Sequence, residues 1–206
     1  KLKKYIFIID EINRGEISKI FGELFFAIDP GYRGRAGAIS TQYSTMSSNE
    51  EKFYIPENVY IIGTMNDIDR SVDSFDFAMR RRFRFIEIKA DSTTDMLDGL
   101  TNININLDSL ENDTLKEDAL NRMERLNKAI VEVEGLNENY QIGAAYFLKL
   151  KTLDFNQLWE DYLQPLLQEY IQGLYNEAEI MTTFAKAYGY KEDKIGDGNG
   201  TFENKG

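Results

Sequence analysis

The first ninety residues alternate between short apolar runs and apolar positions at helical spacing. Residues 5–9, Tyr-Ile-Phe-Ile-Ile, form an unbroken apolar run, which is typical of a strand buried on both faces of a parallel sheet. Helical spacing over 17–28 predicts a helix, which the Asp-Pro-Gly segment at 29–31 ends. Further strands are predicted over 59–64 and 83–88, with a short helix between them. This order of elements predicts an α/β sheet.

The pattern changes near residue 91, beyond which the apolar positions follow only helical spacing. Amphipathic helices are predicted over 120–130, 155–174 and 176–187, and Pro165 should kink the second helix or divide it in two. The predicted parts of the chain are an α/β core over 1–92, a helical domain over 93–188 and a disordered tail over 189–206.

Composition narrows the chemistry that the chain can perform. The 206 residues contain no cysteine and no histidine, which excludes disulfides, thiolate ligands and proton transfer by imidazole. The net charge of −11 divides into +1 over residues 1–90 and −12 over 91–206, which argues against general nucleic-acid binding by the second half. No apolar stretch is long enough to span a bilayer, and we expect a cytoplasmic protein.

Acidic and amide side chains follow the predicted strands. Asp10 and Glu11 end the first apolar run, where nucleotide hydrolases hold Mg²⁺ with an aspartate and polarise the attacking water with a glutamate. Asn66 follows the second strand, and its amide group can both donate and accept a hydrogen bond, as contact with water and γ-phosphate requires. The alternative interpretations are a charged turn after a core strand and an asparagine in a turn.

Three arginines, Arg80, Arg81 and Arg82, lie at the end of the short helix before the third predicted strand. An arginine supplied across a subunit boundary neutralises charge on a phosphoryl group during transfer. The alternatives are a solvated basic turn and cations that compensate a helix C-terminus. The acidic pair, the amide and the arginines together occur in the order that a ring-forming AAA+ ATPase requires.

Four long segments carry a family resemblance and together cover roughly residues 4–175: IFIIDEINRGEISKIFGELFFAID, FYIPENVYIIGTMNDIDRSVDSFDFAMRRRFRFIEI, YQIGAAYFLKL and LWEDYLQPLLQEY. They resemble the McrB family, the GTP-using motors of modification-dependent restriction systems. The resemblance implies a partial AAA+ P-loop NTPase core, beginning at the Walker B segment, followed by an all-helical lid.

The resemblance also implies roles for single residues. Asp10 would be the metal ligand, Glu11 the catalytic acid and Asn66 the first sensor. Arg81 and the adjacent Arg82 would be the arginine finger, which acts on nucleotide in another subunit, and the residue next to it.

Other residues would serve contacts between subunits. Asp69, Arg70 and Arg80 would lie at the subunit junction, and residues 32–54 would form an insert hairpin facing the pore. A flexible polar loop is the alternative for this hairpin. Its residues that would face a partner are Tyr32, Arg33, Arg35 and Lys52.

For the intact protein, the resemblance implies Mg²⁺ with GTP or ATP, a hexameric ring, a McrC-like nuclease subunit as partner, and DNA binding through domains outside this chain. The chain has no G-x-x-x-x-G-K-[ST] segment to cradle phosphates, so we expect it to be the C-terminal part of a longer motor and inactive alone. A general AAA+ remodelling ATPase and a non-catalytic oligomerisation module are the alternative functions.

Two further expectations concern the core of the helical part and the pairing of the strands. Phe155, Trp159 and Tyr162 share helical spacing, which favours a buried lid core over a platform for stacking bases. In sheets of this family a P-loop strand separates the strand before Asn66 from the strand after Arg82. We therefore expect those two strands to pair directly or to be bridged by another chain.

Overall fold

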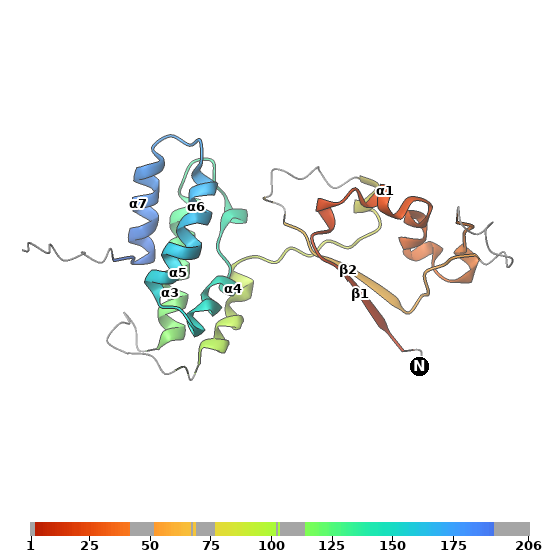
Figure 1. Cartoon of the computed structure of the whole chain (residues 1–206), viewed down its shortest axis with the longest axis horizontal. Coiled ribbons are helices and arrows are strands. Elements are labelled where there is room, and N and C mark those ends of the chain that lie inside the picture. Colours follow the sequence, from red (N-terminus) through yellow and green to blue (C-terminus); the bar gives the residue numbers. More distant parts are fainter. Residues whose placement is uncertain are drawn as a thin grey trace, which may run out of the picture. The chain divides into compact units, whose positions relative to one another are not determined.

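The computed structural model describes residues 3–41, 52–66, 68, 77–101, 103 and 114–191. The chain divides into two compact units, Lys1–Glu87 and Ile88–Gly206, drawn in red to yellow and in green to blue in Figure 1. This division falls earlier in the chain than the boundary predicted after residue 92. The middle of the insert hairpin, 42–51, and almost all of the predicted tail, from 192 onwards, lie outside the described residues.

Two parallel strands organise the first unit. β1 (Tyr5–Ile9) pairs with β2 (Val59–Gly63) over its whole length, with Tyr5 beside Val59 and Ile9 beside Gly63. Both strands lie where the apolar runs predict them. A parallel pair needs a long connection, which here is built from short helical turns. These turns are Ile12–Arg14, α1 (Ile17–Phe21), Gly22–Ile28, Pro30–Tyr32 and Arg35–Gly37, followed by an antiparallel bridge between Ile39 and Phe53.

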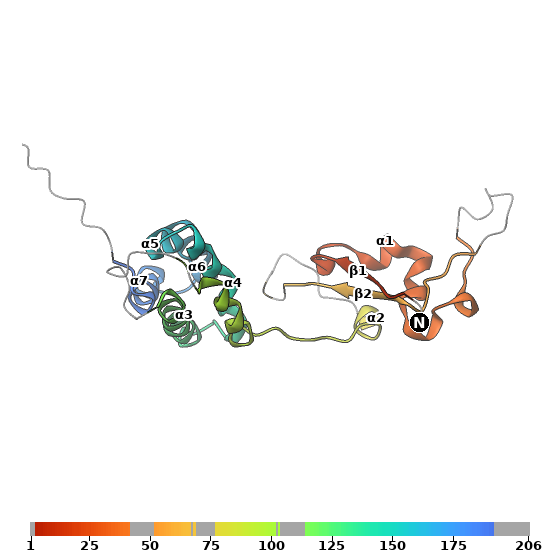
Figure 2. The ribbon, with the colours of Figure 1, turned by 90° about the horizontal axis from the view of Figure 1, so that it is seen from below.

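The connection packs against one face of β2 but leaves most of β1 exposed. Val59 and Ile61 pack against the turn Gly22–Ile28, which Figure 2 shows with α1 on one side of the strands. Side chains alternate between faces along a strand. On β1, Tyr5 and Phe7 are 52% and 54% exposed on this face, and Ile6 and Ile8 are 65% and 64% exposed on the other. The prediction that β1 is buried on both faces is therefore wrong for this structure, because the described helical turns bury neither face of this strand.

The third predicted strand does not form in the structure. α2 (Phe77–Arg80) ends as predicted beside the arginines, but the described residues 84–89 have no strand pairing, and Phe85, Ile86 and Ile88 are exposed. β1 and β2 pair only with each other among the described residues, so direct pairing of 83–88 with β2 is also wrong. A strand is stabilised by backbone hydrogen bonds to a neighbour, and apolar character alone cannot supply them.

The second unit is all-helical over its described residues and has one hydrophobic core. α3 (Leu115–Val131) begins at Thr114, whose hydroxyl accepts a hydrogen bond from the backbone of Glu117. α5 (Phe155–Leu158) is preceded by Asp154, which forms a capping box with Gln157. The other helices are Asp91–Leu100, Glu138–Tyr140, α4 (Ala144–Phe147), Leu148–Lys151, α5 (Phe155–Leu158), α6 (Gln164–Ile171) and α7 (Glu177–Tyr188). No described helix is long and apolar enough to cross a membrane.

Pro165 is accommodated by a change of helix type. A π-helical turn, Trp159–Leu163, joins α5 to α6, and Pro165 is among the first residues of α6. Proline lacks an N–H group and its ring crowds the carbonyl four residues earlier, so a wider turn ahead of it relieves the conflict. The predicted helix therefore runs on past the proline.

The aromatic residues around this turn divide between core and surface. Phe155 and Trp159 are buried, as the predicted lid core requires, and Trp159 stacks on Tyr188 with 5.1 Å between ring centroids. Tyr162 is 38% exposed and lies under the ammonium group of Lys149, 4.1 Å from the ring centroid. Its predicted place in the core is wrong, because the π turn shifts the register of the helix faces.

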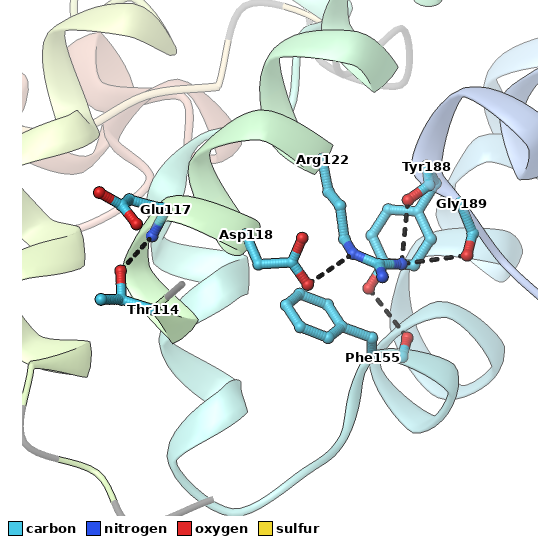
Figure 3. A network of polar contacts seen from close by, with 7 residues as sticks. All are labelled: Thr114, Glu117, Asp118, Arg122, Phe155, Tyr188 and Gly189. Carbon is cyan, nitrogen blue, oxygen red and sulfur yellow. Dashed lines mark hydrogen bonds and ion pairs between the residues drawn. The ribbon is translucent and has the colours of Figure 1, made fainter. Parts of the chain in front are cut away.

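A buried ion pair connects three helices of this unit (Figure 3). On α3, the guanidinium of Arg122 donates to the carboxylate of Asp118 over 3.2 Å and to the carbonyl of Gly189 over 3.0 Å, beyond the end of α7. The same guanidinium lies 4.2 Å from the ring centroid of Phe155 at the start of α5. The hydroxyl of Tyr188 donates to the carbonyl of Phe155, and burial raises the pKa of that hydroxyl. These contacts satisfy both buried charges and hold the helices together.

Candidate functional site at the carboxyl edge of the strand pair

The chemically equipped edge of the first unit is the carboxyl end of β1 and β2. Because Ile9 pairs with Gly63, Asp10 and Thr64 are the next residues on the two strands and lie beside each other. The hydroxyl of Thr64 donates to the Oδ1 atom of Asp10 and accepts a hydrogen bond of 3.0 Å from the backbone N–H of Glu11. The two strand ends are therefore tied together by one side chain.

Asn66 lies at the same edge. The side-chain amide of Asn13 donates to the carbonyl of Asn66 over 3.1 Å, which links the turn after β1 to the turn after β2. The Oδ1 atom of Asn66 accepts from the backbone N–H of Ile68, so the side chain also stabilises its own turn. The structure thus brings Asn66 to the edge that carries Asp10 and Glu11, although Asn66 is more than fifty positions away from them in the sequence.

Glu11 has an unusual backbone conformation. Its φ of 51° and ψ of 49° lie in the left-handed region, which costs a residue other than glycine about 1–3 kcal/mol. Such a conformation persists only where surrounding contacts hold it. The backbone N–H of Ile12 donates to the carbonyl of Thr64 over 2.8 Å, so Glu11 is held on both sides. The left-handed turn redirects the chain immediately after Asp10.

The carboxylate of Glu11 is engaged but accessible. It forms an ion pair with the Nε atom of Arg14 at 3.1 Å, and both side chains are more than half exposed. An exposed pair of this kind contributes only about 0–1 kcal/mol, so a water molecule or a ligand can replace it readily.

Apolar packing beneath the edge places α2 next to it. Ile12 and Met79 are both buried and belong to one cluster, to which Phe25 and Phe83 also contribute. The arginines at the end of α2 are therefore near the acidic turn, which is formed by Asp10 and Glu11 in the same unit.

The three arginines differ in their surroundings. Arg82 turns inward: its Nη1 atom donates to the carbonyl of Ala78 over 2.6 Å, and its guanidinium lies 4.2 Å from the ring centroid of Phe25. Arg80 is exposed and lies over the ring of Phe85. Arg81 is exposed, which makes it better placed than Arg82 to reach another molecule.

The remaining predicted residues are Asp69 and Arg70 and those of the insert segment. Asp69 and Arg70, predicted to lie at a subunit junction, are outside the described residues. In the insert segment, Arg33 donates to the carbonyls of Ile28 and Val59, and burial lowers its pKa. Arg33 is therefore a structural link and is not free to face a partner.

Other insert residues remain accessible. Tyr32 packs on Phe26 with 3.9 Å between ring centroids but stays exposed, and Lys52 is also exposed. A hydrogen bond with Tyr54 raises the pKa of the exposed Arg35.

The acidic edge, by which we mean the carboxyl end of β1 and β2 with Asp10 and Glu11, has oxygen ligands of the kind that Mg²⁺ requires. Among the described residues, no group of three or more carboxylates could hold a metal by itself. Mg²⁺ in nucleotide sites is bound differently, by one or two protein oxygens together with waters and substrate phosphates. Asp10 is exposed at a strand end and has one carboxylate oxygen, Oδ1, engaged by Thr64, so its other oxygen fits this role.

Sequence comparisons identify the family to which this architecture belongs. A model of the AAA domain (dynein-related subfamily) matches residues 2–83, and a model of the McrB alpha-helical lid domain matches residues 118–179. Over 176 residues, 82% of this chain, the sequence is 39% identical to the Type IV methyl-directed restriction enzyme EcoKMcrB subunit of Escherichia coli strain K12. This chain is an McrB-like AAA+ protein. The predicted fold, a partial AAA+ core followed by a helical lid, is thereby confirmed.

A second relative matches a shorter part of the McrB-like chain. The Type II restriction enzyme BsuMI component YdiS of Bacillus subtilis strain 168 is 31% identical over 88 residues, 39% of this chain. The matched regions amount to 37% of the E. coli subunit and 26% of the B. subtilis component. The McrB-like chain therefore spans well under half the length of either relative.

Proposed function

We propose that the carboxyl edge of β1 and β2 is the acidic half of a GTP or ATP hydrolysis site in an McrB-like motor. The observation that supports this most strongly is the convergence of Asp10, Glu11 and Asn66 at one sheet edge, joined by Thr64 and Asn13. Open α/β sheets bind ligands at this edge. The family assignment supplies the reason to expect a nucleoside triphosphate there.

The residues of this edge divide the chemistry among them. Asp10 would hold Mg²⁺, mostly through water, and the bound ion neutralises charge on the β- and γ-phosphates. Glu11 would orient the attacking water after exchanging its contact with Arg14 for that water. Asn66 would donate from its amide nitrogen to the γ-phosphate while its oxygen retains the turn at Ile68.

Two parts of the reaction require groups from elsewhere. The sequence contains no phosphate-cradling G-x-x-x-x-G-K-[ST] segment, so the 206 residues by themselves should not turn over nucleotide. Arg81, which is exposed, would act on nucleotide bound to a neighbouring subunit, while Arg82 would hold α2 in position.

The names of the two relatives support a role in DNA restriction. Both are parts of restriction enzymes, and one of these enzymes is methyl-directed. We accordingly propose a hexameric ring that works with a McrC-like nuclease on modified DNA. DNA contacts would come from other domains, because the second half of this chain has a charge of −12.

Steady-state kinetics of the gene product that carries this chain together with a phosphate loop test the proposal. Glu11→Gln should lower the kcat for GTP or ATP about 100-fold or more, because the water loses the carboxylate that orients it. The matched control is Glu16→Gln, an exposed glutamate paired with Lys19 outside the acidic edge, which should leave kcat unchanged. Equal kcat values for the two variants would refute the proposed role of this edge.

A further inference from the structure

Thr64 forms hydrogen bonds with every residue from Ile9 to Ile12. Its backbone N–H donates to the carbonyl of Ile9 over 3.0 Å, and its carbonyl accepts from Ile12 over 2.8 Å. Its hydroxyl accepts from the N–H of Glu11 over 3.0 Å and donates to the carboxylate of Asp10. One residue on β2's extension therefore contacts all four consecutive residues from the end of β1 to the start of the next turn.

The hydroxyl of Thr64 donates one hydrogen bond and accepts another in this arrangement. A threonine hydroxyl has one proton to donate and lone pairs to accept with. The proton is directed to Asp10, and a lone pair receives the N–H of Glu11. Rotation of the hydroxyl group to any other partner would release the carboxylate, so the orientation of Asp10 and the position of the Glu11 backbone are coupled.

Close packing beside Thr64 holds Ile12, the residue that follows the left-handed turn at Glu11. A Cβ atom at Gly63 would lie 2.9 Å from the Cδ1 atom of Ile12, so the absence of a side chain lets Ile12 cross the end of β2. Ile12 is buried there with Met79. Glu11, with its left-handed backbone, lies between the buried Ile12 and Asp10. Its N–H group donates to the hydroxyl of Thr64, and this hydrogen bond links Glu11 to the end of the other strand.

We propose that Thr64 is a positioning residue for nucleotide hydrolysis, whose hydroxyl sets the Asp10 carboxylate and the left-handed turn at Glu11 together. This inference rests on the proposed function of the acidic edge. Removing the hydroxyl frees the Asp10 carboxylate to rotate and leaves the backbone of Glu11 without its cross-strand partner. The metal ligand and the group that orients water then lose their common alignment while the residues themselves remain.

Amide hydrogen exchange on the full 206-residue chain tests the structural part of this inference. Thr64→Val keeps the side-chain shape, and it should speed exchange of the Glu11 amide about tenfold, as loss of one hydrogen bond implies. Thr64→Ser keeps the hydroxyl and should leave that amide protected. Thr101→Val is the matched control, since the hydroxyl of Thr101 donates only to the carbonyl of Asp98 in the other unit. Unchanged exchange at Glu11 in Thr64→Val overturns the inference.

If amide exchange also becomes faster along Ile6–Ile8 in Thr64→Val, the substitution has loosened the whole strand pair, and Thr64→Ser then provides the test of the inference. A retained hydroxyl must then keep the Glu11 amide protected, and loss of protection in Thr64→Ser contradicts the inference.

Kinetics on a longer polypeptide that carries this chain together with a phosphate loop test the functional part. Thr64→Val should lower kcat at least about tenfold, change KM for the nucleotide less, and raise the Mg²⁺ concentration needed for half-maximal rate. Thr64→Ser should restore both values. A loss of rate without any change in Mg²⁺ requirement would show a merely structural role and overturn the inference. If Glu11→Gln is fully active, the proposed function fails, whereas the amide exchange result for Thr64 stands by itself.

Discussion

The two units of this chain differ in how completely they bury their own apolar side chains. In the helical unit, α3, α5, α6 and α7 enclose a single core around Trp159 and Tyr188. In the strand unit, two small clusters lie under one face of the sheet, while Ile6 and Ile8 remain exposed on the other. The helical unit therefore has the properties of a self-sufficient folding unit, and the strand unit has those of a surface that other residues must cover.

The difference follows from how the two kinds of element satisfy their backbones. A helix makes its hydrogen bonds within itself, so a few amphipathic helices can close a core. A strand needs neighbours on both edges, and a parallel pair needs layers on both faces. The candidate site lies on the less complete unit, where a ligand or another polypeptide can still approach the carboxylates.

The largest expected effect concerns the buried ion pair of the helical unit. Arg122→Ala should destabilise this unit by about 3–5 kcal/mol, because it removes the cation that forms an ion pair with the buried carboxylate of Asp118. Urea unfolding followed by fluorescence measures this directly, since Trp159 is the only tryptophan and lies in the same unit.

Lys128→Ala is the matched control for this experiment. It removes an exposed cation from the same helix and should change stability by no more than about 0.5 kcal/mol. If the two variants unfold at the same urea concentration, the buried network does not hold the helical unit together.

A pair of identical substitutions compares the two units directly. Ile130 is fully buried on α3, and Ile130→Ala should cost about 2–5 kcal/mol. Ile8→Ala on β1 should cost less than about 1 kcal/mol, because its side chain is mostly exposed. Trp159 fluorescence reports the first loss and amide exchange along β1 the second. Equal losses would mean that the exposed face of the strand pair is covered in solution.

A smaller effect than that of Ile130→Ala is expected from the close approach at Gly63. Gly63→Ala should destabilise the strand pair by about 1–3 kcal/mol, because its Cβ atom would displace Ile12. Gly99→Ala is the control, since an added Cβ atom there first meets the flexible end of Lys151. Faster amide exchange along β1 in Gly63→Ala alone is the expected result. No change in exchange would show that Ile12 can move without cost.

The sequence predicted those features whose signal lies within a single segment. The spacing of Leu126 and Ile130 predicted α3, and the apolar runs predicted β1 and β2 with their acidic and amide ends. The order of motifs along the chain was enough to predict an AAA+ core with a helical lid.

The sequence failed where the outcome depends on neighbours far away in the chain. Residues 83–88 have strand composition but join no sheet among the described residues, and β1 has an apolar face with no described layer over it. The side chain of Arg82 points inward because its guanidinium packs on the ring of Phe25, which is distant in sequence. Thr64 was missed because a threonine after a strand is common, although aligning the two apolar runs in parallel would have placed it beside Asp10.

The most direct test of the acidic edge is a single-turnover measurement on the gene product that carries this chain with its phosphate loop. With GTP or ATP bound in advance and Mg²⁺ added to start the reaction, only the chemical step is observed. We predict that Glu11→Gln hydrolyses the bound nucleotide about 100-fold more slowly than Glu16→Gln, at equal nucleotide affinity. Equal single-turnover rates would contradict the assignment of the carboxyl edge of β1 and β2 as a hydrolysis site.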